Sequence, residues 1–305
     1  FPKDQILSIK DNGIGMDKDD LVASLGTIAK SGTTEFLAKL ESSKKDDKDK
    51  SVNLIGQFGV GFYSAFIVSN TVTLLSRKAG DDKANGTKWT SKGKGEYSIE
   101  TVELEDYGTT VILDVKKAES EFIDGFRLRG IVSKYSDHIT VPIMMVKPSE
   151  EDESEIVYET INKATAFWMQ DKKELSQSDY DEFYKSLTYD FEGPLTQIHN
   201  RVEGKLDYTS LLFIPKKAPF DMWEPKRKGG VKLYAKRVFI MEGNEELLPQ
   251  YLRFIKGVID TADLSLNVSR EILQGSKVVD TIKKASVKRI LSELEKMSKN
   301  KPEDY

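Results

Sequence analysis

The chain has 305 residues, enough for about two domains, and its lack of cysteine excludes disulfides and cysteine-ligated metals. Its 46 basic and 50 acidic residues give a net charge of −4, which makes the chain as a whole a poor partner for nucleic acid. No apolar run is long enough to span a bilayer, and the first residues lack the charged-then-apolar order of a signal peptide. The first residue is not a methionine, so we expect the chain to begin inside a larger protein.

The first half of the sequence predicts mainly short strands. Residues 5–10 are predicted to form a strand that runs into the turn Asp11-Asn12-Gly13, and Asp17 is predicted to cap a helix over about 18–26. Residues 41–50 carry four acids and four bases and are interpreted as a mobile surface loop. Runs of β-forming residues predict further strands at 72–77, 88–90, 97–103, 109–115 and 141–146, and a helix is predicted over 121–137.

An acidic run after Pro148 marks the predicted boundary between two domains. Five acids stand between positions 150 and 155, so residues 148–156 are interpreted as a linker between a first domain, 1–147, and a second, 157–305. A solvated hairpin tip is the alternative interpretation, and a linker and a hairpin tip could coexist.

The second half alternates strands and helices again. Helices are predicted near 179–190 and 245–254, with strands near 208–214 and 231–241. A last helix is predicted from Ser276, because apolar residues recur on one side of it, at Val279, Ile282, Val287, Ile290, Leu294 and Met297. Both halves mix strands and helices, so the predicted fold class is α+β in two domains.

Two glycine-containing motifs in the first half suggest a ligand. Asp11-Asn12-Gly13-Ile14-Gly15-Met16 places a carboxylate at the end of a strand, where it could accept a hydrogen bond from an amine such as that of adenine. The run from Gly56 to Ser64 precedes an apolar segment, and a glycine-rich turn at a helix start offers backbone N–H groups to a phosphate. Taken alone, the first motif could be an ordinary turn and the second a close helix–sheet contact.

Two further motifs carry basic residues. The segment from Leu25 to Thr33 has a glycine near each end, which suggests a lid, and Lys30 within it could meet a phosphate or be a plain surface charge. In the second half, Arg270 could act as an arginine finger, because a guanidinium binds two phosphoryl oxygens at once. An ion pair at a helix is the alternative for Arg270. The two histidines, His138 and His199, are far apart in sequence and predict no metal cluster.

Together these motifs resemble those of the ninety-kilodalton heat-shock chaperone family. The resemblance rests on the segments 11–16, 25–33, 56–64 and 267–274 and on Gly108-Thr109, in that family's order. The stretches His199-Asn200-Arg201-Val202-Glu203-Gly204-Lys205 and Ala218-Pro219-Phe220-Asp221-Met222-Trp223 resemble the bacterial branch. The resemblance covers essentially the whole chain, and its motifs are long and specific.

The resemblance implies an ATP-binding sandwich of the kind shared with DNA gyrase and histidine kinases, with an eight-stranded sheet, followed by an α/β middle domain. Asp11 would bond the adenine amine, and Gly15, Met16 and Thr109 would line the base. A lid over about 24–55 would place Ser24 and Lys30 near the nucleotide, although some relatives carry Asn at the position of Ser24. The phosphates would meet the backbone N–H groups of Gly56, Gln57, Phe58, Gly59, Val60, Gly61 and Phe62.

The implied activity is ATP hydrolysis with Mg²⁺ that drives protein folding. Arg270 would reach the terminal phosphate, supported by Asn267 and Gln274. In the family a helix upstream of the Asp11 strand supplies a water-activating Glu and a magnesium-holding Asn. The sequence starts ten residues before Asp11 and does not include that helix, so we expect residues 1–305 alone to bind nucleotide poorly and hydrolyse it negligibly. A topoisomerase-like ATPase and a non-hydrolysing client-binding module are the alternatives.

The implied partners are partly folded client proteins and a second copy of the chain, joined through a C-terminal domain beyond Tyr305, in the cytoplasm. No nucleic acid or membrane partner is expected. Trp168, Phe220 and Trp223 are apolar residues in polar surroundings and are candidates to contact clients. Ordinary core or domain-interface aromatics are the alternative for each.

Overall fold

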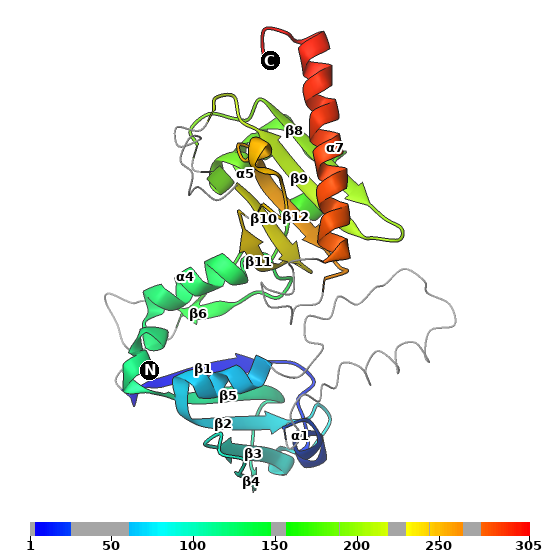
Figure 1. Cartoon of the computed structure of the whole chain (residues 1–305). Coiled ribbons are helices and arrows are strands. Elements are labelled where there is room, and N and C mark those ends of the chain that lie inside the picture. The colour runs from blue at the N-terminus through cyan, green and yellow to red at the C-terminus, as the bar shows by residue number, and fades with distance from the viewer. Residues whose placement is uncertain are drawn as a thin grey trace. The chain divides into compact units, whose positions relative to one another are not determined.

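A computed structural model describes residues 4–25, 61–147, 157–188, 190–218, 230–243, 245–264 and 276–305 (Figure 1). The chain forms two compact units, Phe1–Ile131 and Val132–Tyr305. Both mix strands with helices, which confirms the predicted α+β class. The predicted loop at 41–50 lies outside the described residues. No helix in the described part is long and apolar enough to cross a membrane.

The described part of the first unit is built on an antiparallel sheet of five strands, in the order β1-β5-β2-β3-β4. The strands predicted in this region are confirmed, with ends shifted by a few residues at most. Their bounds are β1 Ile6–Asp11, β2 Ser69–Arg77, β3 Gly86–Ser91, β4 Tyr97–Val102 and β5 Gly108–Val115. The resemblance implies eight strands, of which these five fall in the described residues.

Alternation along the strands places the core of the first unit on one face of this sheet. In β2, Val72 and Leu74 are buried and the residues beside them are partly exposed, as expected for a half-buried strand. Helix α1, Lys18–Leu25, adds Leu21 to this core, where its side chain is completely buried. Burying one such leucine contributes about 1.5–3 kcal/mol to stability.

The helix predicted over 121–137 is divided in two by Asp124. A 3-10 helix covers Lys117–Ile123, and α4 covers Gly125–Tyr135. Asp124 between them has an extended backbone, and its Oδ1 accepts a hydrogen bond from the Arg127 backbone N–H at 2.7 Å. A short polar side chain that caps the next helix in this way interrupts the helix before it.

The acidic segment 148–156 joins two strands that pair with each other. β6, Met144–Val146, and β7, Tyr158–Thr160, are antiparallel neighbours. The Asn162 amide lies next to this hairpin and bonds the Ile143 N–H and the Val141 carbonyl oxygen. These contacts place β6 in the second unit. The two units therefore divide at Ile131/Val132, earlier than the predicted boundary at 148–156. The strands on either side of the acidic segment pair as the hairpin interpretation predicts.

The second unit contains a mixed sheet in the order β11-β10-β12-β9-β8, in which only the described pair β10 and β12 is parallel. The strand predicted at 231–241 is in fact a hairpin, because Lys236 and Arg237 both have positive φ and form a two-residue turn. The bounds are β8 Thr196–Val202, β9 Tyr208–Ile214, β10 Gly230–Ala235, β11 Val238–Glu242 and β12 Lys256–Thr261.

Helices cover both faces of this second sheet (Figure 1). The apolar stripe predicted for the last helix faces the sheet from α7, Lys277–Asn300, where Ile282 and Ile290 are fully buried. Helix α5, Gln177–Thr188, packs on the other face through Tyr180 and Tyr184. The helix predicted over 245–254 is wrong, because only Gln250–Leu252 form a 3-10 turn after the extended Pro249.

Candidate functional site

Three polar side chains lie in one row across the sheet of the first unit. Asp11 in β1 is paired with Thr109 in β5, and Thr109 is paired with Ser76 in β2. Residues directly opposite each other in an antiparallel sheet project from the same face. The Oγ atoms of Ser76 and Thr109 are 3.0 Å apart, which is consistent with that arrangement. The sheet therefore brings together two of the predicted base-binding residues, Asp11 and Thr109.

Ser76 is a site residue that the sequence analysis missed. Its completely buried hydroxyl donates a hydrogen bond to the Gly108 carbonyl oxygen at 2.9 Å and accepts one from the Met16 backbone N–H at 2.9 Å. Ser76 has one hydroxyl proton, so Thr109 must be the donor in the bond between the two side chains. A serine at a core-facing position of β2, two residues after Leu74, is the sequence signal that could have identified it.

Gly15 and Gly108 allow backbone contacts that a side chain would block. Gly15 has a φ of +70°, and a Cβ atom there would lie 1.9 Å from the Arg77 carbonyl oxygen. Gly108 has a φ of +109°, and its Cβ would lie 2.3 Å from the Asp11 carbonyl oxygen. Both positions therefore require glycine, which permits positive φ and close approach of two backbones. They fix the loop after β1 against the ends of β2 and β5.

One oxygen of the Asp11 carboxylate accepts no hydrogen bond from the part of the chain that the structure describes. Its Oδ1 accepts the Gly13 backbone N–H at 2.8 Å, which holds the side chain in place. Asp11 is exposed, and none of the residues that the structure describes donates a hydrogen bond to its Oδ2. An ionised carboxylate can accept several hydrogen bonds, so this oxygen can receive one from an amine.

Two of the predicted ligand-binding residues have apolar side chains. Met16 and Phe62 are half-buried and pack against the core of the first unit. The Phe62 ring meets Trp89 edge to face, with ring centroids 5.6 Å apart. A flat base could lie on such a surface, since small-molecule sites combine apolar walls with a few polar groups.

The predicted phosphate motif is only partly described. Residues Gly61–Ser64 form a 3-10 helix that leads into α3, Ala65–Val68. With four residues, α3 is shorter than expected for a strong helix dipole. The other predicted phosphate and hydrolysis residues fall outside the described ranges: Lys30, Gly56, Gln57, Phe58, Gly59, Val60, Asn267, Arg270 and Gln274.

Helix α1 is fixed at both ends. Asp17 acts as the predicted N-cap, because its Oδ1 accepts the Asp20 backbone N–H at 2.8 Å. At the other end, the Tyr63 hydroxyl donates to the Leu25 carbonyl oxygen at 3.2 Å. The helix thus joins the loop after β1 to the Gly61–Ser64 segment, with the half-buried Ser24 in its last turn. No group of acids or histidines in the described ranges could hold a metal ion by itself.

Trp168, a candidate for client contact, is a core residue, as its alternative interpretation predicts. Its side chain is fully buried on the α5 face of the second sheet, and its indole N–H donates to Asp260 Oδ2 at 2.9 Å. Burial next to a carboxylate acceptor explains why a tryptophan in polar sequence surroundings belongs to the core. Phe220 and Trp223 lie outside the described residues. Phe191, which was not predicted, is 94% exposed.

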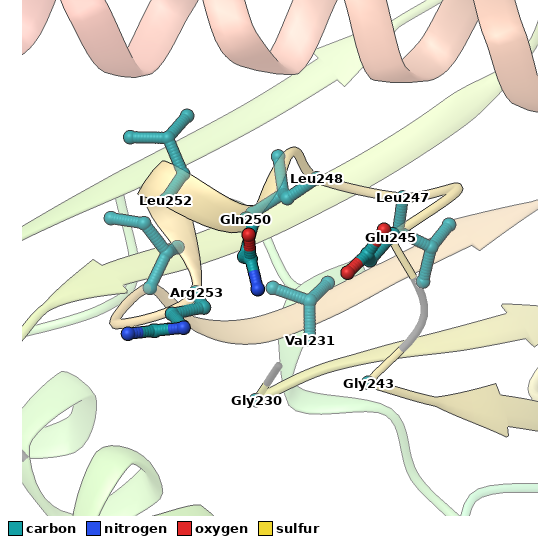
Figure 2. A pocket seen from close by; sticks show the side chains of 10 residues that line it. Gly230, Val231, Gly243, Glu245, Leu247, Leu248, Gln250, Leu252 and Arg253 are labelled. Carbon is teal, nitrogen blue, oxygen red and sulfur yellow. The ribbon is translucent and has the colours of Figure 1, made fainter. Parts of the chain in front are cut away.

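A small cavity in the second unit is not a nucleotide site. Its volume is about 40 Å³, enough for water but far below the roughly 300 Å³ of a ligand pocket. Figure 2 shows leucine side chains beside the polar Glu245 and Gln250 around it. This cavity therefore does not compete with the polar row on the first sheet as a nucleotide site.

The comparison with known proteins identifies the class of the fold and then the family. Residues 2–121 match the family described as histidine kinase-, DNA gyrase B-, and HSP90-like ATPase. Residues 150–305 match the family described as Hsp90 protein. The first unit therefore has the fold of this ATPase class, and the chain belongs to the Hsp90 family.

Bacterial relatives are similar along nearly the whole chain. The chaperone protein HtpG of Ruthia magnifica is 70% identical over 98% of this chain, and that of Hydrogenovibrio crunogenus is 56% identical over 96%. The matched regions make up 48% and 46% of those two proteins. The chain thus spans about half the length of the curated relatives it matches.

Proposed function

We propose that the protein is an ATP-driven molecular chaperone whose first unit binds ATP over the Asp11–Thr109–Ser76 row. The observation that carries the proposal is the available Asp11 carboxylate oxygen next to two backbone contacts that only glycine permits. The relatives named chaperone protein HtpG supply the chaperone part of the proposal.

Adenine recognition follows from the chemistry of this row. In this proposal Asp11 Oδ2 accepts a hydrogen bond from the exocyclic amine, while Thr109 and the backbone near Gly15 and Met16 border the ring. A hydrogen bond to a charged group contributes about 1.5–3 kcal/mol. Such a bond would favour adenine over a base that carries a carbonyl oxygen at the same position.

The phosphates are assigned to the segment from Gly56 to Phe62 and to Lys30. Backbone N–H groups in a glycine-rich turn bind phosphate oxygens without a side chain. Mg²⁺, when bound with ATP, would neutralise phosphate charge. Residues 24–55 act as the lid in this proposal.

Arg270 is proposed to stabilise the terminal phosphate during hydrolysis, with Asn267 and Gln274 supporting its loop. This part of the proposal rests on the sequence motif from Asn267 to Gln274. An arginine in this role accelerates hydrolysis about 10³–10⁵-fold in other phosphoryl-transfer enzymes.

Client binding is assigned to the second unit. Phe191, which is 94% exposed, supports this assignment better than the buried Trp168 does. Phe220 and Trp223 remain candidates from the sequence.

The full-length protein is proposed to act as a homodimer in the cytoplasm. Analytical ultracentrifugation would test the dimer, and cell fractionation would test the location.

Steady-state turnover of the full-length protein tests the ATPase proposal. Asp11→Asn should weaken ATP binding about 10- to 100-fold, and Arg270→Ala should keep binding but reduce turnover at least a hundredfold. Unchanged turnover in Arg270→Ala would remove the arginine from the mechanism. A wild-type protein that binds clients and ATP without turnover would instead indicate a non-hydrolysing module. Residues 1–305 expressed alone should hydrolyse ATP negligibly, because the family's water-activating glutamate lies outside them.

A further inference from the structure

Four contacts fasten the loop after β1 and the start of α1 to the end of β2. The Met16 N–H bonds Ser76, Gly15 lies against the Arg77 carbonyl group, and the Ala79 N–H donates to the Ile14 carbonyl oxygen at 2.7 Å. The fourth contact is made by a side chain, Lys78. The first three belong to the backbone or to Ser76 and follow from the sheet. The contact made by the Lys78 side chain does not follow from the sheet, so its role is a separate question.

Lys78 forms ion pairs with both acids that cap α1. Its Nζ lies 2.8 Å from Asp17 Oδ2 and 2.7 Å from Asp20 Oδ2. The two acids also bond each other's backbone, since Asp17 Oδ1 accepts the Asp20 N–H and Asp20 Oδ2 accepts the Asp17 N–H at 3.4 Å. Each carboxylate therefore accepts a hydrogen bond from the backbone at the start of the helix and another from the lysine.

Electrostatics support a charged cluster at neutral pH. The hydrogen bond that Lys78 donates lowers the pKa of Asp17, and the two bonds that Lys78 donates to Asp17 and Asp20 raise its own pKa. The three side chains are each 36–43% exposed, so water weakens the attraction without removing it.

We propose that Lys78 is a positioning residue for the nucleotide base. Its two ion pairs fix the start of α1 against β2, and this holds Gly15 and Met16 in the conformation that borders the base. Lys78 itself touches neither the base nor the phosphates in this proposal. The inference rests on the proposed function, because it assumes that adenine nucleotides bind at the Asp11 row.

Other ion pairs of the same sheet provide a matched control. Lys88 in β3 pairs with Glu100 in β4 at 3.4 Å, and its side chain is 39% exposed. This pair joins two strands and has no contact with the loop after β1. A variant without Lys88 therefore loses a surface ion pair but keeps the contact between Lys78 and α1.

Calorimetric binding of ADP to the full-length protein tests the proposal. Lys78→Met should raise the ADP Kd about three- to tenfold, since exposed ion pairs contribute modestly and two are lost. Lys78→Arg should bind within about twofold of wild type, because arginine keeps the charge and can reach both carboxylates. Lys88→Met should match wild type. Asp20→Asn should weaken binding in the same direction as Lys78→Met, with less change to the fold.

Urea unfolding measured on the same proteins separates positioning from stability. The proposal holds if Lys78→Met and Asp20→Asn are fully folded under the binding conditions and bind ADP more weakly, and if Lys78→Arg restores binding. It is overturned if both variants bind like wild type, or if Lys88→Met weakens binding equally. A wild-type protein that binds no ADP would overturn the proposed function itself, whereas tight wild-type binding with unaffected variants would overturn only the role of Lys78.

Discussion

Gly15 has a conformation that no other residue could adopt without cost. Gly15→Ala should lower the free energy of unfolding by about 1–3 kcal/mol and weaken ADP binding, because a positive φ and a clash with the Arg77 carbonyl oxygen combine. Gly80→Ala is the matched control, since Gly80 has a φ of +93° but nothing within 4 Å of its Cβ position. Urea unfolding and calorimetry measure both effects. Equal behaviour of the two variants would mean that the Arg77 contact is unimportant.

The buried Trp168 and the exposed Phe191 should respond in opposite ways to truncation. Trp168→Ala should cost about 3–5 kcal/mol of stability, because it leaves a large cavity and removes the indole donor from Asp260. Phe191→Ala should change stability by less than about 0.5 kcal/mol and reduce client binding. Thermal unfolding and a client aggregation assay would check these outcomes. Normal client protection by Phe191→Ala would remove this residue from the client surface.

The sequence predicts some of these residues better than others. Asp11 and Thr109 are predicted from motifs of the family resemblance, and the structure pairs them in neighbouring strands. Ser76 could not be assigned from a motif, since its role depends on the register between β2 and β5. The sequence leaves Trp168 between client contact and the core, because its acceptor, Asp260, lies 92 positions away in the sequence.

Helix α7 contains a buried polar group whose removal should stabilise the protein. Ser286 is 4% exposed, and no group in the described part of the chain bonds its Oγ. Ser286→Ala should raise the free energy of unfolding by about 1 kcal/mol, because it removes an unpaired hydroxyl from the core and improves helix propensity. Ser292→Ala, at a partly exposed position of the same helix, reports the propensity effect alone. A smaller gain in Ser286→Ala than in Ser292→Ala would show that the hydroxyl has a partner.

The sequence predicts elements with a regular apolar periodicity well. It does not predict elements whose ends depend on tertiary contacts. The strands of the first sheet and helix α7 follow their apolar patterns. The sequence allows both a linker and a hairpin at the acidic segment, because strand pairing across such a segment has no local signal. The break at Asp124 and the turn at Lys236-Arg237 depend on single side chains and backbone angles that composition does not reveal.

The two units should differ in their response to pH. Both histidines of the chain, His138 and His199, lie in the second unit, and burial lowers the pKa of each below the ordinary value of about 6.5. The neutral ring of His199 fits its surroundings, since Nε2 donates to the Trp168 carbonyl oxygen and Nδ1 accepts from the Tyr180 hydroxyl. Below about pH 6.5 the unfolded chain therefore binds more protons than the folded unit.

The stability of the second unit should consequently fall as the pH drops from 7.5 to 5.5. The loss is at most about 1.4 kcal/mol per histidine for each pH unit below 6.5. Burial also raises the pKa of Asp260 above its ordinary value of 3.8. This shift has the opposite effect on stability, because just above pH 3.8 the folded unit binds more protons at Asp260 than the unfolded chain does. Hydrogen exchange in β9 and β12, with β2 and β5 as the internal reference, would measure the change. Equal loss of protection in both sheets would contradict the assignment to the histidines.

Recognition of adenine by Asp11 is the central claim, and the relative affinities for ATP and inosine triphosphate test it most directly. Inosine carries a carbonyl oxygen where adenine has its amine, so it cannot donate to the carboxylate. Wild-type full-length protein should prefer ATP about 10- to 100-fold, as expected for loss of one hydrogen bond to a charged group. Asp11→Asn should lose that preference, because an amide can donate to the inosine oxygen. Equal wild-type affinity for the two nucleotides, or an unchanged preference in Asp11→Asn, would contradict the assignment of the base site to the Asp11 row.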